Sequence, residues 1–225
     1  VKEQKPDTSI KLQVIDDNSN DENLKKIRDL INSDGIDCEI INHNKSEHKE
    51  KIAAENNDET FGNLSSLLKC FEIAKKEQSD LIYFVEDDYL HYDHSLVDML
   101  DTYERISSQH KDEIIVCPSD YPFNYMTNEK TNILIGSRQH WRIITKMLCT
   151  FMISKKTFLK HIDSFEKTCE KRHDPFEKYL NEILQKEIAI SPVMSLAIHL
   201  TNVNSSYGLS PFVDYKKLWD ENNVN

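Results

Sequence analysis

The sequence predicts an α/β domain with a mostly parallel central sheet flanked by helices. The main observation is an apolar run without polar alternation, Leu81–Val85, which is typical of a strand buried on both faces of a parallel sheet. Three carboxylates, Glu86-Asp87-Asp88, follow this strand directly. The second observation is that short apolar runs alternate with apolar stripes of helical period along residues 10–117. This alternation is the pattern of strand–helix–strand units.

The elements of the first half follow from the apolar period and from residues that mark helix ends. Ser19 or Asn20 can cap the first helix and Gly35 suits its exit. The polar stretch 42–59 predicts a long loop with a helical turn near 51–55. Strands are expected at 10–15, 38–41, 81–85 and 114–117, and helices over the stripes at 24–31, 64–74 and 96–103.

The second half is less regular, because residues 119–142 are rich in aromatic side chains but have no clear period. Beyond them, strands are expected at 149–153, 188–190 and 196–200, and helices at 155–166 and 175–185. A chain of 225 residues can bury one proper core. We therefore expect a single domain, with a ligand-binding part at about 8–118, a second lobe at about 119–210 and a polar tail at 211–225.

Composition excludes several classes of partner. A formal net charge of -11 disfavours nucleic acid and anionic lipid surfaces, both of which need a basic footprint. The five cysteines are dispersed without a Cys-x-x-Cys pair, so we expect a reducing compartment, no disulfide framework and no zinc site. No apolar run reaches membrane-spanning length and the start is no signal peptide. We expect a cytoplasmic protein with at most peripheral contact with the inner face of a membrane.

The acidic cluster after residue 85 predicts a cation site. Three adjacent carboxylates repel one another unless water or a cation compensates their charge. Hard cations such as Mg²⁺ and Mn²⁺ prefer oxygen ligands, and the carboxyl ends of strands are where open α/β sheets bind ligands. The ordinary alternative is a solvated acidic turn.

Three motifs occur in order along the first half: Asp16-Asp17-Asn18-Ser19 after a strand, Gly62-Asn63 opening a helix, and Glu86-Asp87-Asp88 after a later strand. In this set the chain resembles glycosyltransferases of the GT-A fold, above all a bacterial branch of family 2. The resemblance implies that the nucleotide sugar is bound by Asp16, Asp17, Asn63, Glu86 and Asp87. It also implies that Asp88, in a Glu-Asp-Asp variant of the Asp-x-Asp motif, binds Mn²⁺ or Mg²⁺.

Two further motifs in the second half carry the resemblance. Arg172-His173-Asp174 resembles the position of the catalytic base in inverting members, which implies Asp174 as the base and His173 as the second candidate. An Asp before Pro at a helix start is also an ordinary N-cap. His199 resembles the histidine of a late strand that reaches the metal, although a lone histidine among apolar residues is often a core residue.

The aromatic segment also resembles the bacterial branch, in Ser119-Asp120-Tyr121-Pro122 and His140-Trp141-Arg142. The resemblance places Asp120, Tyr121, Trp141 and Arg142 on the acceptor side. Aromatic rings can stack on a sugar face, and a guanidinium can meet a phosphate or carboxylate. Ordinary packing within the lobe is the alternative.

The chain departs from the family at its start. Members normally open with a strand and a helix before the Asp-Asp strand, whereas only nine residues precede Ile10 here, and the first residue is Val. We expect either that the first strand is missing from this chain or that the base contacts are built differently.

The predicted function is a metal-dependent, inverting glycosyltransferase that moves a sugar from a nucleotide-diphosphate donor to a glycan or glycolipid. A sugar nucleotidyltransferase is one alternative, but that class normally has a Gly-rich phosphate loop, and the four glycines here form none. A non-catalytic carbohydrate- or protein-binding module on the same fold is the other alternative.

Overall fold

The computed structural model describes residues 5, 7–52, 55, 57–126, 128–200 and 213–223. The chain divides into two compact units. The large unit contains Ser79–His161 and Leu180–Asn225, and the small unit contains Lys2–Gln78 and Ile162–Tyr179. Both mix helices and strands, so the protein is of the mixed α/β class.

The small unit begins with a strand–helix–strand element. β1 (Leu12–Asp16) and β2 (Cys38–Asn42) pair in parallel, and α1 (Asp21–Asp34) connects them. The helix begins where the side chain of Asn20 accepts a hydrogen bond from the backbone N–H of Asn23 at 2.8 Å. It ends at Gly35, whose φ of 57° is the left-handed conformation that glycine adopts without strain. These boundaries confirm the sequence prediction.

The rest of the small unit is built around a long amphipathic helix. α2 (Asp58–Lys76) buries the predicted apolar stripe, which includes Leu64, Leu68 and Phe71. Phe71 meets Phe165 of α5 (Ile162–Thr168) edge to face, with ring centroids 5.1 Å apart. A short helix, η1, lies at Lys45–His48, and the helical turn predicted near 51–55 falls partly outside the described residues.

The large unit contains a six-stranded sheet, and it is mostly antiparallel. In spatial order its strands are β3 (Leu81–Phe84), β8 (Phe151–Ser154), β5 (Ile114–Val116), β9 (Ile188–Pro192), β7 (His140–Ile143) and β6 (Ile133–Ile135). Only β5 and β9 pair in parallel. The predicted mostly parallel sheet is therefore wrong for this unit. β8 returns antiparallel between β3 and β5, and β6 and β7 form a hairpin within the segment that showed no period.

The strand before the acidic cluster is less buried than predicted. β3 has β8 as its only strand neighbour among the described residues. Leu81, Ile82 and Tyr83 are half-buried, and Val85 is 51% exposed. A short apolar run cannot distinguish an edge strand from a central one, because tertiary neighbours set its burial.

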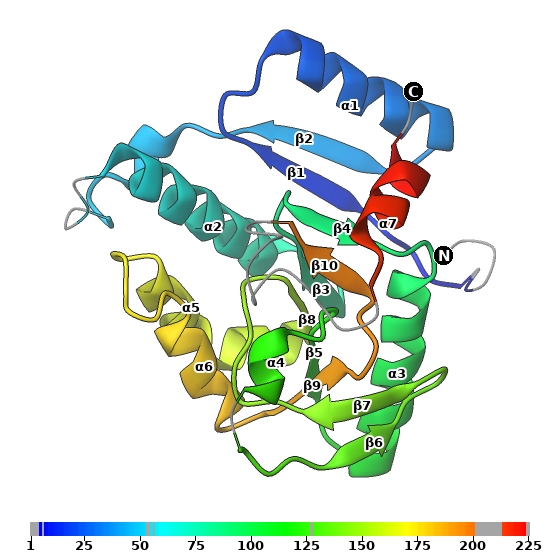
Figure 1. Ribbon diagram of the computed structural model, residues 1–225. Helices are drawn as coiled ribbons and strands as arrows, with labels where there is room; N and C mark the ends of the chain where they lie inside the picture. Colours follow the sequence, from blue (N-terminus) through cyan, green and yellow to red (C-terminus); the bar gives the residue numbers. More distant parts are fainter. Residues whose placement is uncertain are drawn as a thin grey trace. The chain divides into compact units, whose positions relative to one another are not determined.

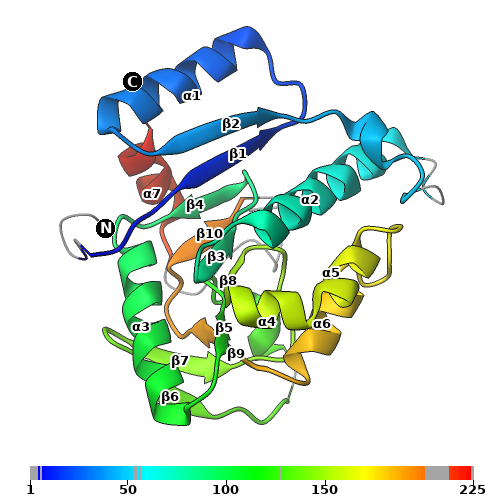
Figure 2. The same cartoon turned by 180° about the vertical axis from the view of Figure 1, so that it is seen from behind.

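The core of the large unit lies between the sheet and α3 (Ser95–His110), which runs beside the sheet in Figures 1 and 2. Buried side chains from α3 and the strands form one cluster that includes Met99, Ile106, Val116, Trp141 and Ile190. The helix predicted at 155–166 is divided at His161 into α4 (Lys155–Lys160) and α5. The helix predicted at 175–185 is shorter than expected, since α6 spans Lys178–Leu184.

A second, two-stranded ladder lies in the large unit beyond the acidic cluster. β4 (Tyr89–His91) pairs antiparallel with β10 (Ala197–His199), and α7 (Tyr215–Asn222) packs against β4 (Figures 1 and 2). Neither β4 nor α7 was predicted, since α7 falls in the segment expected to be a polar tail.

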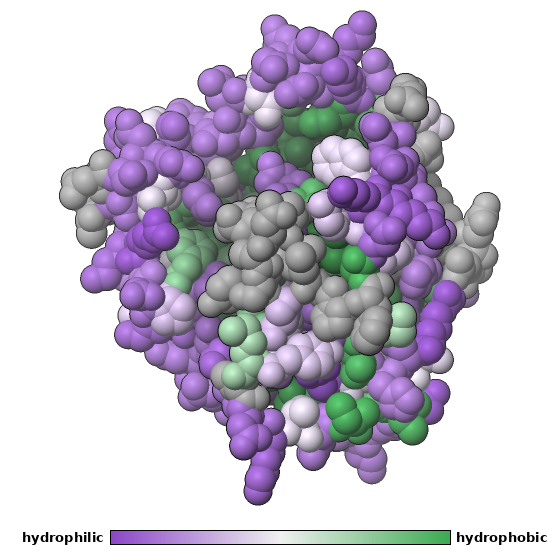
Figure 3. Space-filling view, viewed as in Figure 1, coloured by the Kyte–Doolittle hydropathy of each residue, from purple (hydrophilic) through white to green (hydrophobic). Residues whose placement is uncertain are grey.

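The surface is polar, as the composition indicates. Hydrophilic side chains cover the outer face of α1 in Figure 3, whereas hydrophobic side chains gather at the end of the large unit where Ile133 and Ile135 of β6 are exposed. Among the described residues, no helix is long and apolar enough to cross a membrane.

Candidate functional site

The acidic cluster forms the turn between β3 and β4. Glu86 is fixed at the start of this turn by Thr150, which accepts a hydrogen bond from the Glu86 backbone N–H at 3.0 Å and donates one to its Oε2 at 3.3 Å. Asp87 is exposed and Asp88 is half-buried. The turn therefore presents two carboxylates to solvent on a backbone that a buried threonine anchors.

The structure brings Asp88 and His199 together. Nε2 of His199 lies 2.8 Å from Oδ2 of Asp88, and their side chains are 16% and 33% exposed. Asp88 directly precedes β4 and His199 ends β10, and the antiparallel register puts both at one end of the ladder, where Tyr89 stands opposite His199. The ring of Tyr89 also stacks on the imidazole of His199, with centroids 4.8 Å apart, which fixes the plane of the imidazole.

This pair has the spacing of two ligands of one cation. Ligand atoms that each lie about 2.0–2.2 Å from a metal are about 3 Å apart when they occupy neighbouring coordination positions. One imidazole nitrogen with carboxylate oxygens is a donor set that fits Mn²⁺, and substrate oxygens can complete its coordination. No group of three or more His, Cys, Asp or Glu side chains arranged to hold a metal is found among the described residues. A cation held by Asp88 and His199 would therefore need further ligands beyond this pair.

Two aromatic residues expected on the acceptor side are buried. Tyr121 is 2% exposed and its hydroxyl shares a hydrogen bond with the hydroxyl of Tyr89. Trp141 is fully buried, and a Cβ added to Gly136 would lie 2.2 Å from its Nε1. Neither ring offers a face to solvent, so the expectation that they stack on an acceptor sugar is not supported. Their burial is the ordinary packing that the sequence left open.

Asp120 and Arg142 belong to a buried polar cluster. Asp120 is fully buried, and the hydroxyl of Tyr125 donates to its Oδ2. Nη2 of Arg142 lies 3.5 Å from Oδ1 of Asp120 and donates to the hydroxyl of Tyr125 at 2.5 Å. Burial raises the pKa of the Asp120 carboxyl to about 6, against the opposing effects of Tyr125 and Arg142. The guanidinium of Arg142 is therefore already bound by protein groups. Tyr125 is 50% exposed, so the cluster reaches the surface at this residue.

The small unit contains three of the predicted nucleotide-binding residues, Asp16, Asp17 and Asn63, near the carboxyl end of β1, whereas Glu86 and Asp87 lie in the large unit. Asp16 is buried and its Oδ1 accepts a hydrogen bond from the Ser19 backbone N–H at 3.1 Å. Asp17 is exposed, and its Oδ2 lies 3.1 Å from the position that a Cβ on Gly62 would take. Asn63 follows Gly62 and is exposed in the second turn of α2, which begins at Asp58 and not, as predicted, at Gly62-Asn63. Asp16 therefore shapes the turn, whereas Asp17 and Asn63 face solvent.

Beside these residues lies a buried histidine network that the sequence did not reveal. The hydroxyl of Ser65 lies 2.8 Å from Nε2 of His43 and 2.8 Å from Nδ1 of His48. Nε2 of His48 lies 3.2 Å from Oε2 of Glu72, which also pairs with Lys51 at 2.5 Å. These residues form no recognisable sequence motif, because they come from three separate segments: η1, α2 and the end of β2.

The network fixes the proton positions when both imidazoles are neutral. The carboxylate of Glu72 can only accept, so His48 carries its proton on Nε2 and its Nδ1 accepts from Ser65. The Ser65 oxygen then accepts from Nε2 of His43, which leaves Nδ1 of His43 as an acceptor. Within the described part of the chain, that buried nitrogen has no hydrogen-bond partner. Burial, followed by the nearby His48, lowers the pKa of His43, while Asp17 opposes this shift.

The predicted catalytic base lies in the small unit. Asp174 is exposed, and α6 begins only at Lys178, so Asp174 does not cap that helix. His173 is half-buried, its Nε2 donates to the backbone carbonyl of Lys167 at 3.0 Å, and its ring meets Tyr179 edge to face. The side chain of Asp174 is therefore accessible to solvent, whereas one nitrogen of His173 is hydrogen-bonded within the unit.

No protein-family model matches the sequence, and no curated protein sequence matches it either. The interpretation of the site therefore rests on the geometry of the residues themselves.

Proposed function

We propose that this protein is a metal-dependent glycosyltransferase that moves a sugar from a nucleotide-diphosphate donor to a glycan or glycolipid acceptor with inversion. The observation that carries the proposal is the approach of His199 to Asp88 at 2.8 Å on the turn that follows β3. Two motifs more than a hundred residues apart in sequence meet at one point, where both side chains remain accessible to solvent.

The chemistry of glycosyl transfer explains the use of such a pair. Negative charge develops on the diphosphate as the bond to the anomeric carbon breaks, and a divalent cation held by Asp88 and His199 would neutralise that charge. Asp87 is exposed beside this pair and can accept hydrogen bonds from ribose or sugar hydroxyls. Glu86, held by Thr150, fixes the turn that carries both.

The GT-A fold is part of the proposal. Support comes from the parallel β1–β2 pair, which ends in the Asp16-Asp17 turn, and from β3, which ends in the acidic turn. In this proposal Asp16, Asp17 and Asn63 bind the nucleotide. Asp174 accepts the proton of the acceptor hydroxyl, with His173 as the second candidate. The proposal includes a cytoplasmic location, with at most peripheral contact with a membrane.

The test combines binding with turnover. A thermal-shift screen of UDP-, GDP-, dTDP- and CMP-sugars with and without Mn²⁺ identifies the donor, because a ligand of the native state raises its stability. Release of the nucleoside diphosphate from that donor then measures turnover, which should require Mn²⁺ and be lost in His199→Ala. Binding without release indicates a non-catalytic module. Formation of a nucleotide sugar from a nucleoside triphosphate and a sugar phosphate indicates a nucleotidyltransferase.

A further inference from the structure

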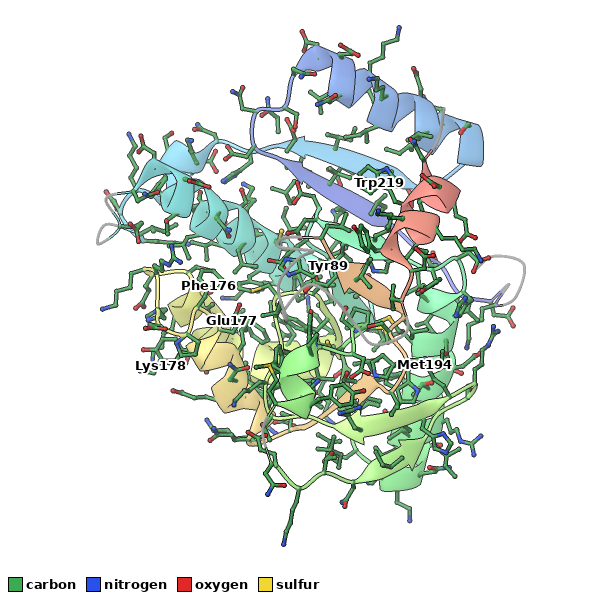
Figure 4. The ribbon with its side chains drawn as sticks, viewed as in Figure 1. Tyr89, Phe176, Glu177, Lys178, Met194 and Trp219 are labelled. Carbon is green, nitrogen blue, oxygen red and sulfur yellow. The ribbon has the colours of Figure 1, made fainter. Side chains whose placement is uncertain are left out.

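A cavity in the large unit, at α7, is lined by none of the residues of the proposed site. It has a volume of about 410 Å³ and is lined by Leu200, Tyr215, Lys216, Trp219 and Asp220. Four of these five residues come from α7, and Leu200 directly follows β10. Figure 4 labels Trp219 on this helix together with Tyr89 of β4. Trp219 is 51% exposed, which is unusual for the largest apolar side chain.

The sequence of α7 places two kinds of side chain in neighbouring rows. Tyr215 and Trp219 are four residues apart, as are Lys216 and Asp220, so each pair lies along one side of the helix. The helix is held independently of them. The side chain of Asp214 caps its first turn, accepting from the Lys217 backbone N–H at 3.1 Å, while Leu218 is buried. The aromatic row and the charged row are therefore not needed to form the helix.

The charges at the cavity balance. Lys216 and Asp220 supply one ammonium and one carboxylate, and neither has an ion-pair partner among the residues that the structure describes. The other charged pair of the helix, Lys217 and Glu221, is matched at 3.6 Å. A lining of apolar faces with one donor and one acceptor group suits a neutral ligand that has both an apolar face and hydroxyl groups.

One lining residue of the cavity, Leu200, is hydrogen-bonded to the turn that carries the proposed cation site. The backbone N–H of Leu200 donates to the carbonyl of Asp88 at 2.7 Å, and the side chain of the preceding residue, His199, pairs with that aspartate. Leu200 thus belongs both to the wall of the cavity and to the strand end that fixes the Asp88–His199 pair.

We propose that this cavity binds a neutral pyranose ring of the acceptor glycan, stacked on Trp219. The description of this sugar as part of the acceptor rests on the proposed function, but the binding of the sugar to the cavity does not. One face of a pyranose carries mainly C–H groups that pack on the indole, and the hydroxyls at its edge can donate to Asp220 and accept from Lys216. A phosphate or nucleotide is disfavoured because the cavity has no net positive charge.

The protein offers a direct optical test, because it contains only two tryptophans and the other one, Trp141, is fully buried. The probes are methyl glycosides of glucose, galactose, mannose and N-acetylglucosamine, with their β1,4-linked disaccharides, titrated while tryptophan emission is recorded. At least one should change the emission saturably. Trp219→Phe should abolish this signal while keeping an aromatic ring, and Trp219→Ala should weaken binding of the same sugar at least tenfold by calorimetry. Lys217→Ala is the matched control on the same helix and should leave affinity unchanged.

The outcomes separate the cavity from the proposed function. Sugar binding that depends on Trp219 in a protein that releases no nucleoside diphosphate supports the cavity and refutes the transferase. In an active enzyme, Trp219→Ala should raise the KM for the acceptor at least tenfold and leave hydrolysis of the donor unchanged. The inference is overturned if no sugar of the panel binds, if Asp220→Asn and Trp219→Ala both bind it as the parent does, or if Trp219→Ala weakens nucleoside diphosphate binding instead.

Discussion

The substitution Asp88→Asn tests the cation site most directly, because it removes a charge and keeps the shape of the side chain. The cost to folding should be small. The Asp88–His199 pair is partly exposed, and pairs of this kind contribute about 0–1 kcal/mol. For a chain of this size each kcal/mol shifts the Tm by roughly 2–4 °C. The variant should therefore melt within a few degrees of the parent.

The effect on binding should be much larger. A charge of -1 and a charge of +2 about 2.2 Å apart attract by about 4 kcal/mol even with the dielectric constant of water. Each 1.4 kcal/mol is a factor of ten, so the Kd for Mn²⁺ with nucleoside diphosphate should rise by about 10³-fold. Titration calorimetry with Mn²⁺ and the nucleoside diphosphate selected by thermal shift measures this change.

Asp93→Asn is the control, because Asp93 follows the acidic motif closely in sequence, is fully exposed and pairs with the adjacent His94 at 3.0 Å. It removes the same charge and should leave the Kd unchanged. The assignment of Asp88 as a metal ligand is refuted if Asp88→Asn binds within threefold of the parent, or if both variants weaken binding equally.

Three further predictions concern the groups around the site. Ser65→Ala leaves polar atoms of His43 and His48 buried without their shared partner, so it should cost about 1–3 kcal/mol per orphaned group in chemical denaturation, whereas Ser33→Ala on exposed α1 should cost little. Gly136→Ala forces a methyl group to within 2.2 Å of Trp141, which should destabilise the protein by about 1–3 kcal/mol or more and shift Trp141 emission. The raised pKa of Asp120, about 6, means that the native state binds more protons than the unfolded state between about pH 4 and pH 6. This carboxyl therefore lowers stability as pH rises through that window, and the slope of unfolding free energy against pH should become more positive there in Asp120→Asn.

The sequence was most informative where local chemistry decides the structure. The cap at Asn20 and the left-handed Gly35 give the boundaries of α1, because each depends only on residues a few positions away. The apolar stripe gives the buried face of α2 but not its start, which lies at Asp58 and not at Gly62-Asn63. The approach of His199 to Asp88 was also expected, although from a family resemblance rather than from a local pattern.

The errors arose where distant neighbours decide the outcome. The run Leu81–Val85 was expected to be a central strand, yet β3 pairs only with β8 among the described strands. The residues of the run do not determine which strand lies beside it. The family resemblance placed Trp141 and Tyr121 on the acceptor side, but both are buried, because an aromatic ring fills a core as readily as it lines a site. By contrast, the spacing of Tyr215 and Trp219 after the capping residue Asp214 was a detectable helical signal.

The register of the β4–β10 ladder is what converts two separate motifs into one site. Side chains alternate across a strand, so a shift of one residue would turn His199 to the opposite face from Asp88. Two backbone hydrogen bonds set this register from both ends: Tyr92 N–H donates to the Leu196 carbonyl at 3.0 Å, and Leu200 N–H donates to the Asp88 carbonyl at 2.7 Å. Because one of these bonds is made by the backbone of Asp88 itself, the residue proposed to hold the cation also helps to position its partner ligand. A substitution that changes only the side chain of Asp88 leaves that bond in place, and this is why its effect should appear in binding and not in the fold.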